Sequence, residues 1–497
     1  MPPSTNRTEP QQNDASALSR GLPRHLGQHS AGMVTLRRRN LGPIAVAPTG
    51  RPRRVSTWQT RIDGTTAAGY GGGIMLHSLS LPGLPNLLNR CHVPWDLEAV
   101  TTRGEEVPPR SVGVEPEGVR AMWRAVERFY RTGLHPALQL CVRRRGQVVL
   151  DRAIGHAAGN APGDPPDAPK RLATTDTPFC IFSAAKAVTA MVVHLLDQRG
   201  VLHVNDPVTE YIPEFGCHGK ERVTIEHVIT HRAGIPNMPA AETHLDNLAH
   251  PERVVEILCD SEPTWAPGRR LAYHAITGGF ILAEVVRRAT GRDIRAVLRD
   301  EILAPLGFRW MSYGVAPEDV PLVAMNAFTG PRPLPPMATL ARRALGVDFV
   351  DVATLANDPR WLATIVPAAN IMTSAKELSR FYQLLLNEGE LDGVRVYEPR
   401  TIRRATSEQS YLEFDLTLGI PTRYSAGFIL GQFPFYGPDT PYAFGHLGFI
   451  NIVAWADPER NVAAALTNSG KPFFFPEALF LYDVMRQVTL ACPKEPA

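Results

Sequence analysis

The sequence has few cysteines, few lysines and no long hydrophobic run. Its six cysteines among 497 residues are widely separated and form no C-x-x-C pair, which argues against a disulfide framework or a thiolate metal site. No stretch approaches the ~18 consecutive apolar residues of a membrane helix, and the N-terminus lacks the apolar segment of a secretory signal. We therefore expect no transmembrane segment, a reducing compartment and a cytoplasmic location.

The charge is nearly balanced. Lys and Arg number 52 against 49 Asp and Glu, a net charge of +3. Most of the positive excess lies in the Arg-rich first 60 residues, which leaves the remainder slightly acidic. This distribution argues against a nucleic-acid partner. Hydrophobic residues make up 44% of the chain, as is typical of a globular protein.

The first part of the chain differs in composition from the rest. Residues 1–110 are rich in Arg, Pro and Gly and show no sustained apolar period, so we predict a disordered extension there. A solvated tail or a misassigned start codon explains it most simply, and an organellar transit peptide or a tail for an anionic surface is the alternative. We predict one folded domain over residues 111–497.

The folded part alternates strand-like and helix-like segments. Apolar residues at helical spacing begin at Val119, and Pro116 suits the first turn of that helix. Further segments are a hairpin at 137–143 and 147–154, helices at 182–198 and 377–387, strands at 423–433, 450–456 and 461–467, and a helix at 476–490. A mainly helical insert occupies about 235–365. We predict an α+β fold, an α/β sandwich in which helices flank an antiparallel sheet built from both ends of the chain.

The pair Ser183 and Lys186 is the strongest chemical signal. Residues three apart share one helix face, so the hydroxyl and the amine can approach each other. The helix is apolar almost all round, which indicates burial, and burial lowers the pKa of a lysine toward a neutral amine that can act as a base. A serine nucleophile requires such a base. Only about 0.2 such Ser-x-x-Lys pairs are expected by chance in a chain of this composition.

Several motifs follow this pair in a fixed order. They are Phe182-Ser183-Ala184-Ala185-Lys186, Asn205-Asp206-Pro207-Val208, Thr230-His231-Arg232-Ala233-Gly234, Pro267-Gly268 before Tyr273, Met372 to Leu378, and Gly445-His446-Leu447-Gly448. This order resembles the serine β-lactamase and penicillin-binding-protein-like superfamily over about residues 112–490. Within it, the class C β-lactamases and the family VIII carboxylesterases are most similar. The resemblance implies a β-lactamase/transpeptidase-like fold.

The resemblance also implies roles for individual residues. By the S-x-x-K motif, Ser183 would be the nucleophile and Lys186 its base. Tyr273 would relay a proton to the leaving group, although a lone tyrosine is often only a core residue. His446 would border the site, with a structural role as the alternative.

The same resemblance implies an oxyanion hole and a substrate channel. The backbone N–H groups of Ser183 and Phe449 would form the oxyanion hole. A side chain at Gly448 would obstruct an acyl group that lies along the strand edge. No dinucleotide fingerprint, P-loop or H-E-x-x-H motif occurs, so no cofactor and no metal are expected.

Two positions depart from the β-lactamase pattern. Ala275 stands where a side-chain amide would bind the substrate, and His446 replaces a lysine whose fixed charge would face a carboxylate. An ester needs neither contact. We therefore predict a serine hydrolase that cleaves small carboxylic esters through an acyl-enzyme on Ser183. The alternatives are a β-lactamase or D-stereospecific peptidase, and a catalytically silent member that serves as a binding module.

Overall fold

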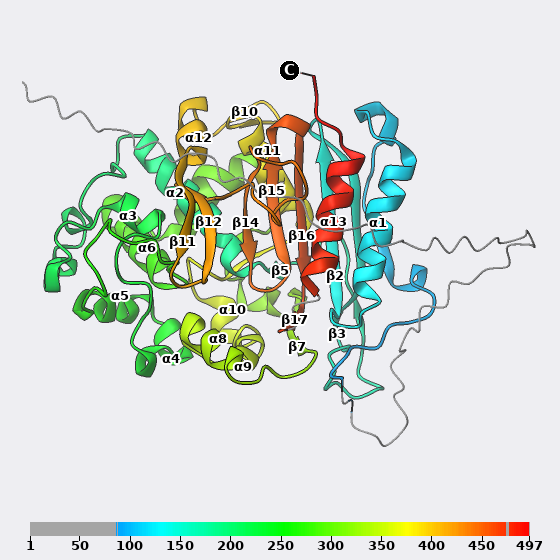
Figure 1. Cartoon of the computed structure of the whole chain (residues 1–497), viewed down its shortest axis with the longest axis horizontal. Helices are drawn as coiled ribbons and strands as arrows, with labels where there is room; N and C mark the ends of the chain where they lie inside the picture. The colour runs from blue at the N-terminus through cyan, green and yellow to red at the C-terminus, as the bar shows by residue number, and fades with distance from the viewer. Residues whose placement is uncertain (1–85, 87, 474–476, 497) are drawn as a thin grey trace, which may run out of the picture. The chain divides into compact units, whose positions relative to one another are not determined.

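A large antiparallel sheet dominates the computed structural model, which describes residue 86, residues 88–473 and residues 477–496 (Figure 1). Within these residues the sheet has ten strands, in the order β1–β3–β2–β16–β15–β14–β13–β12–β11, with β4 paired to β3. The strands are β1 (Thr101–Arg103), β2 (Ala137–Arg144), β3 (Gln147–Ala158), β4 (Arg171–Leu172), β11 (Glu408–Asp415), β12 (Ile420–Ser425), β13 (Ile429–Leu430), β14 (Phe444–Gly448), β15 (Ile452–Asp457) and β16 (Val462–Asn468).

The two ends of the chain meet in the middle of the sheet. Strand β2 pairs with β16, so that Leu140 lies opposite Leu466. Helices α1 (Pro116–Tyr130) and α13 (Glu477–Ala491) lie side by side on one face of the sheet (Figure 1). Leu138, Leu140 and Trp455 of the sheet belong to the buried core between that face and these helices. The α+β prediction, including the sheet built from both ends, is confirmed.

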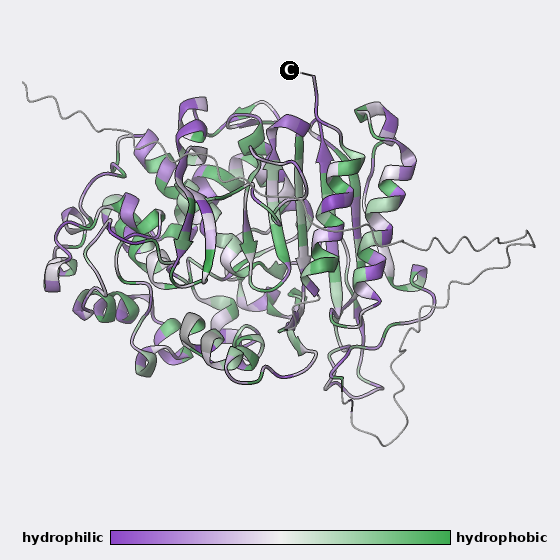
Figure 2. Cartoon of the chain, in the orientation of Figure 1, coloured by the Kyte–Doolittle hydropathy of each residue, from purple (hydrophilic) through white to green (hydrophobic). Residues whose placement is uncertain are grey.

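Helices α2 (Ala185–Gln198) and α11 (Ala375–Leu386) pack in the core on the opposite face. The sheet residues there are small, including Cys141, Ala463 and Ala465, which lets the helices approach closely. Because both faces are covered, the central strands β2 and β16 are buried along their length. Helix α1, by contrast, alternates hydrophobic and hydrophilic residues (Figure 2). The predicted helix 182–198 is confirmed, with a 3₁₀ turn, η3 (Phe182–Ala184), preceding α2.

Between the sheet halves the chain forms mainly short helices. They are α3 (Ile225–Ile229), α4 (Leu245–Leu248), α5 (Pro251–Asp260), α6 (Thr277–Thr290), α7 (Ile294–Leu298), α8 (Met337–Leu345), α9 (Phe349–Leu355), α10 (Pro359–Ala363) and, after α11, α12 (Pro399–Thr406). Three small sheets accompany these helices, and the last of them is a local hairpin. They are β5 (Phe179–Cys180) with β8 (Ile371–Thr373) and β6 (Ser312–Tyr313), β7 (Ala327–Thr329) with β17 (Gly470–Pro472), and β9 (Glu390–Leu391) with β10 (Val394–Arg395).

Two sequence predictions are wrong in part. The disordered extension was placed over residues 1–110, but residues 88–110 are folded, because β1 pairs with β3 and Leu97 and Val100 are buried. Residues 1–85 and 87 lie outside the described residues. The single strand predicted over 423–433 is broken instead. Strand β12 ends at Ser425 and β13 begins at Ile429, because Gly427 between them has a φ of +121° and lies against the helix residue Ala190.

Candidate active site

Ser183 lies in a strained turn between β5 and α2. The preceding residue, Phe182, has a φ of 47°, in the left-handed region that non-glycine residues rarely occupy. Such strain is retained where the surrounding structure enforces it, often at functional sites. The turn places Ser183 near the N-terminus of the buried helix α2 and leaves it partly accessible.

The Lys186 amine points back at Ser183. Its Nζ lies 3.3 Å from Ser183 Oγ, 2.6 Å from the carbonyl oxygen of Ala275 and 3.1 Å from that of Ala368. Burial lowers the pKa of Lys186 from 10.5 to about 7. A neutral amine has two hydrogens, and the two carbonyl oxygens can accept both. The lone pair is then directed at the Ser183 hydroxyl, from which it can take a proton.

Tyr273 completes this group from a third segment of the chain. Its phenol lies close enough to the Ser183 side chain for that side chain to lower the phenol's pKa, and the Lys186 amine lies 4.7 Å from the centre of its ring. Burial has the larger effect and raises the pKa of Tyr273 above its usual value, so the phenol is protonated. The structure therefore brings Ser183 and Lys186 together, as their spacing predicted, and adds Tyr273, as the resemblance implied.

His446 projects from β14 toward the same group. It is 2% exposed, its ring centre lies 6.4 Å from that of Tyr273, and Nδ1 donates to the Leu447 carbonyl 2.7 Å away. Burial, together with the nearby charge of Lys186, lowers the pKa of His446 to about 3. This side chain therefore carries no charge at neutral pH.

Strand β14 ends against the turn that carries Ser183. A Cβ atom on Gly448 would lie 2.4 Å from the Ile181 carbonyl oxygen, and the Phe449 ring lies 5.5 Å from that of Phe182. Gly448 thus permits a close approach of two backbone segments. This contact is a structural reason for a glycine there, and the path for an acyl group along the strand edge stays a prediction. The amides of Ser183 and Phe449 belong to these two adjoining segments.

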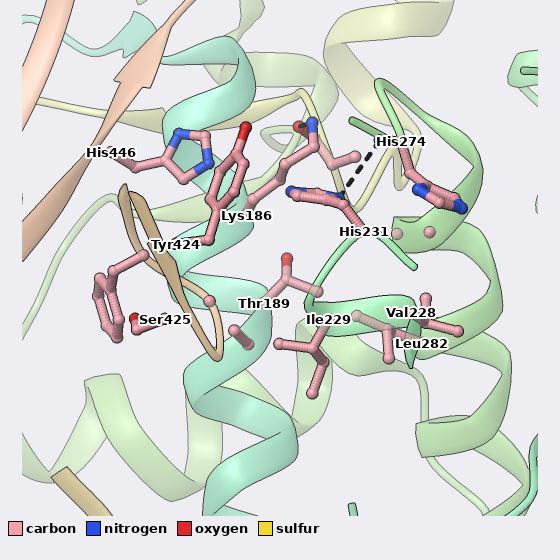
Figure 3. Close-up of a pocket in the computed structure, with 16 residues that line it drawn as sticks. Lys186, Thr189, Val228, Ile229, His231, His274, Leu282, Tyr424, Ser425 and His446 are labelled. Carbon is pink, nitrogen blue, oxygen red and sulfur yellow. Dashed lines mark hydrogen bonds between the residues drawn. The ribbon is translucent and has the colours of Figure 1, made fainter. Parts of the chain in front are cut away.

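Two further histidines adjoin the group. The backbone N–H of His274 donates to His231 Nδ1 over 3.3 Å, and the His231 ring lies 4.7 Å from that of Tyr273. Burial lowers the pKa of both, that of His274 to about 4. Figure 3 shows His231, Lys186, Tyr424 and His446 converging on one side of a small cavity. His231 belongs to the motif Thr230-His231-Arg232-Ala233-Gly234, but the motif alone does not predict the contact of His231 with Tyr273.

An apolar cavity opens beside Ser183. It has a volume of about 80 Å³. Its walls come from the Ser183 turn and from α4, α8, α9 and α10, and they contain no charged residue. They are formed by Phe182, Ser183, Thr243, Leu248, Ala275, Ile276, Leu345, Val347, Val352, Leu355, Ala356, Trp361, Ala369 and Phe449. The cavity could not be predicted from the sequence, because the residues that line it are spread over more than two hundred positions and come together only in the folded protein.

The part of the chain that the structure describes contains no cluster of His, Cys, Asp or Glu side chains suited to a metal ion. Over the same residues, no helix is both long and apolar enough to cross a membrane.

Comparison with known proteins connects this geometry to a family. The family model described as Beta-lactamase matches residues 124–483. The Esterase/beta-lactamase LipL of Mycobacterium tuberculosis is 31% identical over 357 residues, which cover 66% of this chain and 76% of that protein.

Two solved structures have a similar fold. A penicillin-binding protein homologue from Caulobacter crescentus gives a TM-score of 0.66 at 25% identity, covering 76% of this chain and 99% of that one. A family VIII carboxylesterase gives a TM-score of 0.64 at 26% identity, covering 75% and 98%. With the family model matching well over half of its residues, this chain belongs to the β-lactamase family.

Proposed function

We propose that the protein is a serine hydrolase that cleaves short-chain carboxylic esters through an acyl-enzyme on Ser183. The observation that carries this proposal is the position of the Lys186 amine, which lies 3.3 Å from the Ser183 hydroxyl and has a pKa lowered by burial to about 7. A buried lysine that is neutral at physiological pH can activate a serine, whereas a charged lysine cannot. Relatives named as esterases support the choice of ester chemistry.

The proposed reaction has two halves. Lys186 takes the Ser183 proton as Oγ attacks the ester carbonyl, and the amides of Ser183 and Phe449 bind the developing oxyanion. The Tyr273 phenol then gives its proton to the leaving alkoxide and recovers one from Lys186. In the second half a water molecule attacks the acyl-enzyme, its proton passes through Tyr273 to Lys186, and Ser183 leaves with a proton. The net reaction consumes one water and yields an acid and an alcohol.

The site favours esters over β-lactams for an electrostatic reason. Ala275 offers no side-chain amide, and His446 is neutral where a positive charge would bind a carboxylate. A hydrogen bond to a charged group contributes roughly 1.5–3 kcal/mol and one between neutral groups roughly 0.5–1.5 kcal/mol, so losing one of each lowers β-lactam turnover by about 30-fold to 2,000-fold. The uncharged cavity beside Ser183 suits an apolar acyl group instead. Its volume of about 80 Å³ is near half that of a ~150 Å³ apolar cavity that binds benzene, which supports a short acyl chain.

Steady-state kinetics test the proposal. We expect p-nitrophenyl butyrate to be hydrolysed with a higher kcat/KM than a chromogenic cephalosporin. A fluorophosphonate probe should label the wild-type protein and not the Ser183→Ala variant, while Ser261→Ala, a serine outside the site, should be labelled like the wild type. A higher kcat/KM for the cephalosporin would make the protein a β-lactamase, and absence of labelling would indicate a silent member of the family.

A further inference from the structure

Asp415, the last residue of β11, is a buried carboxylate close to the candidate active site. It is 0% exposed. Its Oδ1 accepts hydrogen bonds from the backbone N–H groups of Tyr273, Thr417 and Leu418 at 2.9–3.0 Å. Its Oδ2 accepts one from the Tyr424 hydroxyl at 3.2 Å. Burying a charge is costly unless it is fully hydrogen-bonded, so this arrangement needs a reason beyond packing.

The contacts fix the backbone around Tyr273. Asp415 holds the N–H of Tyr273, while His231 on the other side accepts from the N–H groups of Ala272 and His274. Three successive amides are thus held alternately by two different parts of the chain. The N–H of Leu416 also donates to the Leu271 carbonyl over 3.1 Å, which ties the β11–β12 hairpin to the same segment.

Asp415 also holds Tyr424, a residue that packs with Tyr273. Tyr424 packs with Leu271, Tyr273 and Ile429 in one small buried cluster, and its hydroxyl is held by Asp415 Oδ2. The same carboxylate therefore restrains the main chain of Tyr273 and one of the rings beside its phenol. A displacement of about 1 Å in such a group can reduce a rate by about a hundredfold.

We propose that Asp415 is a positioning residue, which holds the Tyr273 hydroxyl against Ser183 so that the leaving alcohol receives its proton. This inference rests on the proposed function, because it assigns to Asp415 the support of one step in that reaction, proton delivery. It concerns a residue 142 positions away from Tyr273 in the sequence and on a different element.

The charges around Tyr273 are consistent with this role. Lys186 and Ser183 face it from the α2 side, His231 from the end of α3, His446 from β14 and Tyr424 from β12. Burial raises the pKa of Tyr273, and the negative charge of Asp415 adds a smaller effect in the same direction. A phenol that remains protonated is the form needed to donate a proton.

The test uses two esters with the same acyl group and different leaving groups. p-Nitrophenolate leaves without being protonated, whereas the alkoxide of ethyl butyrate requires a proton. General acid catalysis contributes about 10² to 10⁴ to a rate. We therefore expect Asp415→Ala to lower kcat/KM for ethyl butyrate at least about 30-fold more than for p-nitrophenyl butyrate, with Tyr273→Phe giving the same pattern. The parameter kcat/KM is used because it reports acylation, the step that releases the alcohol.

Further variants separate positioning from general damage. Asp415→Asn keeps an oxygen for the three backbone amides and should restore ethyl butyrate hydrolysis to within about threefold of wild type. Phe414→Ser, at the exposed neighbouring position, should leave kcat/KM unchanged for both esters. If Asp415→Ala does not fold, Tyr424→Phe, which removes the bond to Oδ2, should lower kcat/KM for ethyl butyrate more than for p-nitrophenyl butyrate, by a smaller factor than Asp415→Ala.

The outcomes distinguish this inference from the proposed function. Fluoride leaves a fluorophosphonate without protonation, so labelling of Ser183 should persist in Asp415→Ala. Equal losses for both esters, or wild-type kinetics in Asp415→Ala, would overturn the positioning role while leaving the serine hydrolase intact. A wild-type protein that neither labels nor hydrolyses either ester would refute the proposed function itself.

Discussion

The hydrolytic rate should disappear in mild acid as Lys186 becomes protonated. With a pKa of about 7, the amine is mostly neutral at pH 8 and only about 1% neutral two pH units below its pKa. The value of kcat/KM for p-nitrophenyl butyrate should therefore rise about tenfold per pH unit up to about pH 7 and then level off. His446, with a pKa of about 3, is already neutral throughout this range, so its titration adds no second change in kcat/KM with pH.

Lys186 should also make the free energy of unfolding depend on pH. Lowering the pKa from 10.5 to about 7 corresponds to roughly 5 kcal/mol at 1.36 kcal/mol per pH unit, by which burial disfavours the charged amine. The unfolded chain then binds more protons than the folded one between about pH 7 and 10.5, so the folded state gains stability as the pH rises through that window. Lys186→Met removes this dependence. It also leaves the carbonyls of Ala275 and Ala368 without a donor, at about 1–3 kcal/mol each.

Two measurements decide the matter. Initial rates by pH-stat between pH 5.5 and 9 give the midpoint, and paired thermal melts of wild type and Lys186→Met at pH 7 and pH 10 give the linkage. We expect Lys186→Met to lose activity and to lose its relative stability against wild type as the pH rises. Lys471, also buried with a pKa lowered to about 7, is common to both proteins and cancels in the difference. A flat rate profile, or a difference in melting temperature that does not change with pH, would refute a titrating Lys186 base.

Three other changes have defined outcomes. Ser183→Ala should abolish the acyl-enzyme seen by mass spectrometry after mixing with substrate, with an unchanged melting temperature, and a persisting adduct would place the nucleophile elsewhere. Leu345→Ala enlarges the cavity beside Ser183 and should raise the ratio of kcat/KM for p-nitrophenyl hexanoate to that for p-nitrophenyl butyrate at least about tenfold. An unchanged ratio would show that the acyl group does not occupy that cavity. Removal of residues 1–85 should preserve activity, while removal of residues 1–105 deletes β1 and should lower the melting temperature, and equal stability of the two truncations would contradict a structural role for β1.

The parts of the fold that were predictable are those in which a local pattern and the tertiary structure agree. The helix at 182–198 and the hairpin at 137–154 follow from apolar spacing and a turn signal, and both are confirmed. Strand β1 was not predictable, because Thr101, Thr102 and Arg103 have no apolar alternation and are held by pairing with β3. The break at Gly427 depends on contact with a helix that the local sequence does not encode.

The candidate site divides in the same way. Ser183 and Lys186 are neighbours on one helix, so their spacing alone predicts that they meet. Tyr273 could be placed only through the resemblance of its surrounding motif. Asp415 and the cavity beside Ser183 gave no signal, because their meaning depends on contacts between residues far apart in the chain.

The pairing of β2 with β16 has a consequence for synthesis. It joins residues as distant as Leu138 and Asn468, a separation of 330 positions, and β14 lies beyond β16 and β15 in the same sheet. Contacts of such long range form late, and the C-terminal strands are the last to leave the ribosome. A nascent chain thus carries Ser183, Lys186 and Tyr273 for about a third of its synthesis, from residue 273 to residue 444, while the strand that ends at Gly448 is still missing. We expect fragments that stop before β14 to be hydrolytically inert, which would confine the reactive serine to chains in which β14 has been made.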